Sequence, residues 1–141
     1  MKRAFQNIFY SLTLNNHQLL RFILHHFQFV GDHIIASTEN GLEKDWEGFT
    51  CFVNPPYGRG IDKWIKKGYN EAMKNETKVV MLIPARTDTK YWHNYVMKAS
   101  EIYFVKGRLK FGDSKNSAPF PSAVVIFDGG EGLWRTEGIN K

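Results

Sequence analysis

The chain has 141 residues, about the length of one domain, and a domain of that size buries roughly two-thirds of its unfolded surface. Hydrophobic residues make up 43% and charged residues 23%, which excludes a disordered or fibrous chain. Nineteen Lys and Arg against fourteen Asp and Glu give a net charge of +5, which permits a nucleic-acid partner without requiring one.

The N-terminal part carries one clear helical pattern. Leucine, isoleucine and phenylalanine recur at helical spacing, with Asn15 or Asn16 as N-cap, which predicts a helix over roughly 16 to 27. Polar residues interrupt the preceding apolar run, and no small-residue cleavage site follows, so we expect no signal peptide. No stretch reaches the ~18 apolar residues of a membrane span. The next segment, 30–48, has the glycine and asparagine content of connecting loops.

A strand and a helix are predicted on either side of residue 55. The apolar run 49–53 predicts a strand that ends at Pro55, because proline cannot donate to a sheet ladder. Cys51 is the single cysteine and no Cys/His ligand set exists, so we expect neither a disulfide nor a metal site, and a reducing cytoplasm fits. The following segment predicts an amphipathic helix with Asp62 in its first turn, Lys74 in its last, and one apolar stripe: Ile61, Trp64, Ile65, Ala72 and Met73.

The remaining elements alternate between strand and helix before the pattern changes. The run 78–85 predicts a strand covered on both faces, and 87–100 predicts a helix capped by Thr87 or Asp88. Two further strands, 101–107 and 121–129, are joined by a polar loop without a helix. This order predicts a single α/β domain with a mostly parallel sheet and an antiparallel pair at one edge. The tail 129–141 is glycine-rich, and we expect it to be loose.

The stretch "FVNPPYGRG" (52–60) is the strongest candidate for a site. It follows a predicted strand, and ligands of open α/β sheets bind beyond the carboxyl ends of the strands. Two prolines fix the backbone and remove two amide donors, which leaves the Asn54 side-chain oxygen and the Pro55 carbonyl as rigidly held acceptors. Two convergent acceptors match an exocyclic amine, and the Tyr57 ring can stack on the base that carries it. The alternative is an ordinary turn between a strand and a helix.

Five blocks together indicate a family. "NPPY" resembles the motif of S-adenosylmethionine-dependent amino-methyltransferases, whose substrates include adenine, cytosine, guanine and protein glutamine. The ordered set resembles the phage and prophage DNA adenine-N6-methyltransferases over residues 41–127: "GLEKDW", "FVNPPYGRGIDKW", "LIPARTDTKYWHNYV", "KGRLKF" and "APFPSAVVIF". Residues 41–128 are thus the best-matched core of the single domain 1–141, and 1–40 match poorly.

The resemblance implies a fold, a chemistry and a place. It implies a Rossmann-like class I sheet, S-adenosylmethionine as cofactor, double-stranded DNA as substrate, and no metal. The target adenine would be flipped out of the duplex. Asn54 and Pro55 would hold its amino group, Pro56 would shape the turn and Tyr57 would stack on the base. The enzyme would act in the cytoplasm of a bacterial host.

The cofactor side has two alternative alignments. On the first, Asp32 with Ala36 and Ser37 is a shifted remnant of the Asp-x-x-Ala segment of the family, which makes Asp32 and Asn54 the candidate cofactor-binding residues. Alternatively, the segment 32–46 matches a later part of the family pattern, and the sheet is truncated on its N-terminal side. A degenerate DNA-binding relic and an RNA or protein-amide methyltransferase are therefore kept as alternative functions.

Five cations are candidate DNA contacts: Arg59, Arg86, Lys106, Arg108 and Lys110. Arg86 follows a predicted strand, and the last three alternate along an extended segment, so they are expected on one side where phosphates can be met. Two alternatives explain the same residues. Arg86 can be a solvated arginine beside a capped helix, and Lys106, Arg108 and Lys110 can lie on a solvated strand face. Trp64, Trp92 and the phenylalanines are expected in the core, with no role in the site.

Overall fold

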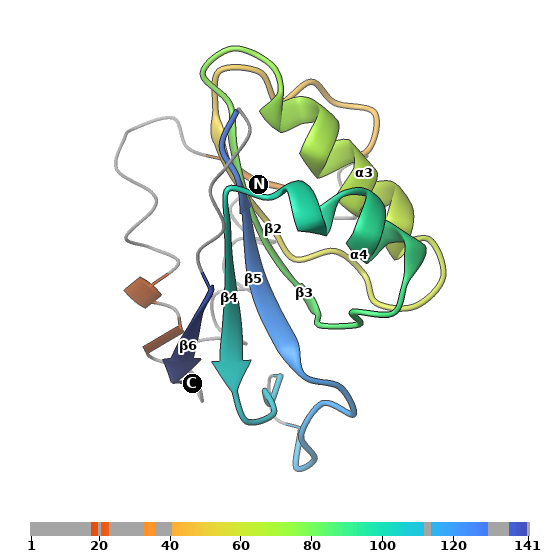
Figure 1. Ribbon diagram of the computed structural model, residues 1–141, viewed down its shortest axis with the longest axis vertical. Helices are drawn as coiled ribbons and strands as arrows, with labels where there is room; N and C mark the ends of the chain where they lie inside the picture. Colours follow the sequence, from red (N-terminus) through yellow and green to blue (C-terminus); the bar gives the residue numbers. More distant parts are fainter. Residues whose placement is uncertain are drawn as a thin grey trace.

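The computed structural model describes residues 18–19, 21–22, 33–35, 41–111, 114–129 and 136–140. These residues form one six-stranded sheet in the order β1-β2-β3-β5-β4-β6, with the helices α3 and α4 together on one face (Figure 1). The strands are β1 (His33–Ile35), β2 (Thr50–Val53), β3 (Lys78–Pro84), β4 (Glu101–Lys106), β5 (Ser122–Phe127) and β6 (Thr136–Asn140). The helices are α3 (Ile61–Ala72), α4 (Lys90–Asn94) and the 3-10 turn η2 (Val96–Lys98).

One strand of the described sheet runs against the others. β1, β2 and β3 are mutually parallel, β4 and β6 are parallel, and β5 is antiparallel to both of its neighbours, β3 and β4. The predicted α/β class and the antiparallel pairing of β4 with β5 are confirmed. Their predicted place at an edge was wrong, because β5 lies between β3 and β4 and β6 lies beyond β4.

The composition of β5 suits its interior position. All six of its residues are buried, as expected for a strand with neighbours on both sides and cover on both faces. β3 is also apolar on both faces. Val79, Met81 and Ile83 pack in the cluster that includes α3, whereas Val80 and Leu82 pack in a second cluster. The tail is ordered at 136–140, contrary to prediction, because these residues pair with β4.

Helix α3 confirms the predicted amphipathic helix with two corrections. Gly60 precedes it in the left-handed region (φ 91°), and Ile61, Trp64 and Ile65 are buried against the sheet. Met73 is 48% exposed and does not belong to the apolar stripe, because the helix ends at Ala72. Lys74 therefore lies beyond the last turn.

The second predicted helix is shorter than expected. Thr89, and neither Thr87 nor Asp88, caps α4: its backbone is extended and its hydroxyl accepts from the Trp92 N–H at 3.4 Å. Tyr95, with φ −127°, interrupts the helix before η2. Of the helix predicted over 16–27, residues 18, 19, 21 and 22 are helical, and the others lie outside the described residues.

A buried carboxylate joins the "GLEKDW" segment to α3. Glu71 is 3% exposed, and it accepts hydrogen bonds from the Trp46 backbone N–H (3.0 Å), from Lys67 and from Lys74. Lys74 also bonds Asp45 at 2.8 Å, which lowers the pKa of Asp45 to about 2. The buried Trp46 indole N–H donates to the Gly41 carbonyl at 3.0 Å. The segment is thereby fixed against the helix that follows the candidate site.

Candidate functional site

A pocket of about 270 Å³ lies where three separate segments meet. Tyr57 and Gly58 come from the turn after β2, Arg86 from the loop after β3, and Phe120 from the approach to β5. The carboxyl ends of the parallel strands β2 and β3 share one edge of the sheet. The antiparallel strand β5 starts at that same edge, since Ser122 pairs with Pro84. The sheet topology therefore brings together three of the blocks that the sequence singled out.

The "NPPY" turn is held by a hydrogen bond within itself. Tyr57 Oη donates to Asn54 Oδ1 at 2.9 Å. Asn54 is half-buried, Pro55 is buried and Pro56 is exposed. Burial raises the pKa of Tyr57, so its hydroxyl stays protonated and keeps its role as donor. The amide oxygen of Asn54 has a second lone pair, which a ligand can use.

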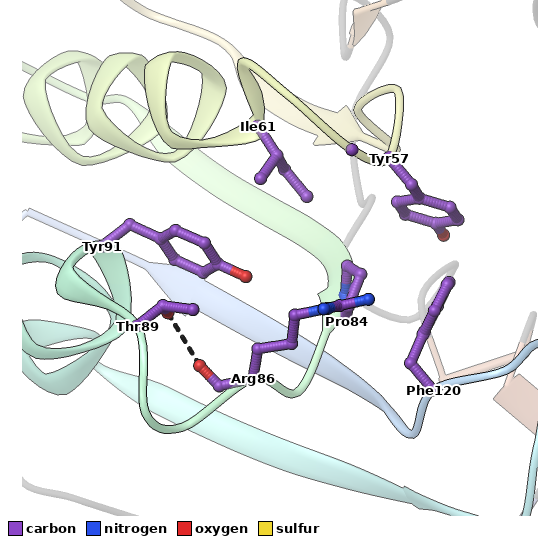
Figure 2. A pocket seen from close by; sticks show the side chains of 8 residues that line it. Tyr57, Ile61, Pro84, Arg86, Thr89, Tyr91 and Phe120 are labelled. Atoms are coloured by element: carbon purple, nitrogen blue, oxygen red, sulfur yellow. Dashed lines mark hydrogen bonds between the residues drawn. The ribbon is translucent and has the colours of Figure 1, made fainter.

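Two phenylalanines complete an aromatic wall beside Tyr57. The Tyr57 ring meets Phe120 edge to face at a centroid distance of 5.0 Å and Phe111 at 5.7 Å. Figure 2 shows Tyr57 and Phe120 on the same side of the pocket. The expectation that the phenylalanines serve only the core was wrong for Phe120, which lines the pocket. Its position within the block "APFPS" was the signal that could have identified it.

The loop after β3 is folded by its own hydrogen bonds. The Arg86 carbonyl accepts from Thr89 Oγ1 at 2.7 Å, a bond drawn in Figure 2, and from the Thr89 N–H at 3.3 Å. The Ala85 N–H donates to the Pro121 carbonyl at 2.8 Å, which ties this loop to the approach to β5. The Arg86 guanidinium carbon lies 5.9 Å from the Phe120 ring centre. An exposed cation therefore stands at the rim of an aromatic pocket.

Tyr91 forms the side of the pocket opposite Tyr57 (Figure 2). It is 9% exposed, and its hydroxyl has no hydrogen-bond partner among the described residues. Tyr91 lies within the helix predicted over 87–100, and the sequence predicted no role in the site for it. The helical period locates the face of a residue but carries no information about the end of a long side chain.

The other predicted cations lie around this edge of the molecule. Arg59 is exposed in the turn before α3, next to the pocket residue Gly58. Lys106, Arg108 and Lys110 are exposed, and Leu109 between them is fully buried. The three cations do not continue one strand, because β4 ends at Lys106 and Gly107 adopts φ 76°. Phe111, which directly follows them, connects this segment to Tyr57.

The predicted cofactor-binding residues Asp32 and Asn54 flank the strands β1 and β2. Asp32 lies outside the described residues, immediately before β1. β1 runs parallel to β2 with Ile35 opposite Val53, so the chain leaves β1 beside Asn54. Ligands of open α/β sheets bind beyond the carboxyl ends of the strands, and β2 places Asn54 at that edge. Within the described residues, no group of three or more His, Cys, Asp or Glu is placed to hold a metal ion.

No helix of the described part of the chain combines the length and the apolar character that crossing a membrane requires.

The comparisons with known proteins agree with one another. The family model described as "DNA N-6-adenine-methyltransferase (Dam)" matches residues 8–127, well over half of the chain. The DNA N-6-adenine-methyltransferase of Haemophilus phage HP1 (strain HP1c1) is 29% identical over 102 residues. That match covers 68% of this chain and 58% of the phage protein, so the chain spans less than two-thirds of this curated relative.

Proposed function

Because the chain belongs to the DNA N-6-adenine-methyltransferase family, we propose that it transfers a methyl group from S-adenosylmethionine to N6 of adenine in double-stranded DNA. The observation that carries this proposal is the convergence of Tyr57 from the "NPPY" turn, Arg86 from the loop after β3 and Phe120 on one pocket at the carboxyl edge of the parallel strands; Asn54, which does not line the pocket, is joined to it through its hydrogen bond with Tyr57. This is the edge at which ligands bind to open α/β sheets. The related phage protein supports the same substrate.

In this proposal the turn after β2 holds the amine of an extruded adenine. Asn54 Oδ1 already accepts the Tyr57 hydroxyl, so one lone pair remains for an N6 hydrogen. The Pro55 carbonyl takes the other hydrogen, and the two acceptors leave the nitrogen lone pair facing away from them. The prolines supply this geometry at low entropic cost, since their φ angles are already fixed. Positioning and polarisation of the amine are therefore the main catalytic contributions of the chain.

The pocket has the wall composition that a flat heterocycle requires. Aromatic rings stand on one side, and Ile61 and Pro84 add apolar surface. Stacking of a base on an aromatic ring contributes ~1–3 kcal/mol, which offsets part of the few kcal/mol needed to extrude the base from the duplex. Tyr57 is the stacking residue in this proposal, with Phe111 and Phe120 fixing its ring.

S-adenosylmethionine is assigned to the crevice between β1 and β2, in a Rossmann-like class I arrangement of the sheet. Asn54 is the proposed contact, because it follows β2 at the carboxyl edge of the sheet; Asp32, the other candidate from the sequence, precedes β1 in the chain and lies outside the described residues. When bound, the cofactor supplies an electrophilic methyl carbon on a sulfonium. The chain needs no metal for this chemistry, since the leaving group is already positively charged.

Double-stranded DNA is proposed to approach the same edge of the sheet. Arg59 and Arg86 flank the pocket, and Lys106, Arg108 and Lys110 extend the exposed positive charge. Cations of this kind bind phosphates and hold the duplex in register over the pocket without reading its sequence. Such an enzyme would work in the cytoplasm of the bacterial host in which a phage or prophage is expressed.

Transfer of isotope-labelled methyl from S-adenosylmethionine to DNA, RNA and protein in parallel reactions tests the proposal. We expect label in N6-methyladenine of DNA, and none with Asn54→Ala. Label in RNA alone or in protein alone would show that this molecule, and not DNA, is the substrate. Binding of DNA without detectable binding of the cofactor at millimolar concentration would favour the non-catalytic relic.

A further inference from the structure

The pocket wall carries three hydroxyl groups, and two of them have their hydrogen-bond acceptors in the protein. The Tyr57 hydroxyl donates to Asn54, and the Thr89 hydroxyl donates to the Arg86 carbonyl. The third, on Tyr91, has no partner within the described residues although the side chain is more than nine-tenths buried. In Figure 2 this hydroxyl is directed toward the middle of the pocket.

An unpaired buried hydroxyl destabilises the folded protein, so its retention needs an explanation. A phenylalanine at this position would fill the same volume without the unpaired oxygen. Because the hydroxyl is directed into a cavity of about 270 Å³, a ligand bound there can supply the hydrogen-bond partner that the described residues do not. A ligand without a polar atom at this point would leave the hydroxyl dry and unpaired. The hydroxyl thus selects among ligands.

The surroundings indicate which kind of ligand atom is selected. No acceptor among the described residues takes the proton of the Tyr91 hydroxyl, so that proton is left for an acceptor atom of a ligand. Aromatic and aliphatic walls around the cavity favour a flat heterocycle. A heterocycle presents ring nitrogens as acceptors within its plane.

We propose that Tyr91 Oη donates a hydrogen bond to a ring nitrogen of the extruded adenine and is a specificity determinant of the site. The identity of the base rests on the proposed function. Asn54 and Pro55 would recognise the amine as a donor, and Tyr91 would recognise an acceptor of the same base. In a base whose corresponding ring nitrogen carries a hydrogen, that N–H would face the O–H of Tyr91. Two donors cannot form a hydrogen bond, so such a base would bind more weakly.

Binding of four nucleosides tests this assignment without requiring turnover. The probes are 2′-deoxyadenosine and its 1-deaza, 3-deaza and 7-deaza analogues, each analogue lacking one ring nitrogen. Dissociation constants are measured by ligand-observed NMR with excess S-adenosylhomocysteine, which occupies the cofactor site. The proteins are the wild type, Tyr91→Phe, and the control Tyr95→Phe, whose half-buried ring lies against Tyr69 and outside the pocket.

We expect Tyr91→Phe to bind 2′-deoxyadenosine about tenfold more weakly than the wild type, the loss that corresponds to one buried hydrogen bond. One deaza analogue should show the same weakening with the wild type and no further weakening with Tyr91→Phe. Tyr95→Phe should bind like the wild type. Three results would overturn the inference. They are equal affinity of the wild type and Tyr91→Phe for 2′-deoxyadenosine, a further weakening of Tyr91→Phe by each of the three analogues equal to that of the wild type, and no detectable binding of any nucleoside.

Thermal unfolding separates a ligand-binding role of the hydroxyl from a structural role. The melting temperature of Tyr91→Phe without ligand should equal or exceed that of the wild type, because the variant removes an unpaired polar atom. A lower melting temperature would show that the hydroxyl is bonded within the protein, and would overturn the inference. Methylation that is insensitive to Tyr91 would refute this assignment alone, whereas Tyr91-dependent nucleoside binding without methylation would refute only the proposed chemistry.

Discussion

Tyr57 Oη donates to Asn54 Oδ1 at 2.9 Å, and this bond links the proposed stacking ring to the proposed amine acceptor. An amide side chain that is already oriented loses less entropy when it accepts a second hydrogen bond. The hydroxyl of Tyr57 and its ring thus have separate effects, which two substitutions can distinguish.

Asn54→Ala should lower kcat for DNA methylation by about 10²–10³-fold, the range for loss of one preorganised polar group. Tyr57→Phe keeps the ring and removes only the bond to Asn54, so its loss should be about tenfold. The double variant should be no slower than Asn54→Ala, because the hydroxyl acts through the amide. Single-turnover kinetics measure all three, and wild-type turnover in Asn54→Ala would contradict the assigned role.

Phe120→Leu should weaken DNA binding and turnover by about tenfold, because the edge-to-face contact at 5.0 Å that fixes the Tyr57 ring is lost. The expected effect combines loss of stacking geometry with loss of pocket wall. Kd and kcat/KM for a duplex substrate check it. Phe104→Leu, at an exposed position on β4 that does not line the pocket, is the matched control.

Arg86→Ala and Lys110→Ala should each weaken DNA binding at every sequence, and each should reduce the slope of log K against log salt by about 0.9. The reason is release of one counterion for each phosphate contact. Fluorescence anisotropy over a salt series gives the slope. Lys66→Ala, exposed on α3, should leave it unchanged; an equal change in Lys66→Ala would show that only net charge matters.

Glu71→Gln should lower the free energy of unfolding by about 1–3 kcal/mol at neutral pH, since three donors lose a charged acceptor. Burial alone would raise the pKa of Glu71, but hydrogen bonds from Lys67, Trp46 and Lys74 lower it below its ordinary value of 4.5. A carboxylate with a lowered folded-state pKa stabilises the fold above that ordinary value, and the contribution disappears as pH falls through the lower one.

The difference between wild type and Glu71→Gln should therefore shrink in acid. Urea denaturation at a series of pH values from neutral to about 3 measures it. Glu76→Gln, exposed in the turn after α3, is the matched control and should differ little from wild type at any pH. A difference for Glu71→Gln that stays constant with pH would show that its charge is irrelevant.

Gly68→Ala should destabilise the protein by about 1–2 kcal/mol, although alanine favours helix formation. A Cβ at this position would lie 2.7 Å from Met81 Sδ and 3.3 Å from Val79 Cγ1, at the contact of α3 with β3. Asn70→Ala, at an exposed position of the same helix, should instead stabilise by a few tenths of a kcal/mol. Urea denaturation of both variants compares the two effects.

The sequence by itself determined the elements whose signals are local. The all-apolar run of β3 and the stripe on α3 specify burial through their periods, and Pro55 ends β2 because it lacks an amide proton. The position of the "NPPY" turn was predicted because its prolines end the strand. The resemblance of five ordered blocks then gave the family, which the family comparison confirms.

Tertiary structure alone decided how these pieces meet. The insertion of β5 between β3 and β4 is a choice among sheet orders that the apolar pattern of β5 leaves equal, and it is this order that brings Phe120 to Tyr57. The unpaired hydroxyl of Tyr91 was equally invisible, because a helical period describes which face is buried and not which polar atoms find partners. Hydrogen-bond partners distant in the chain are fixed only when the sheet order is fixed.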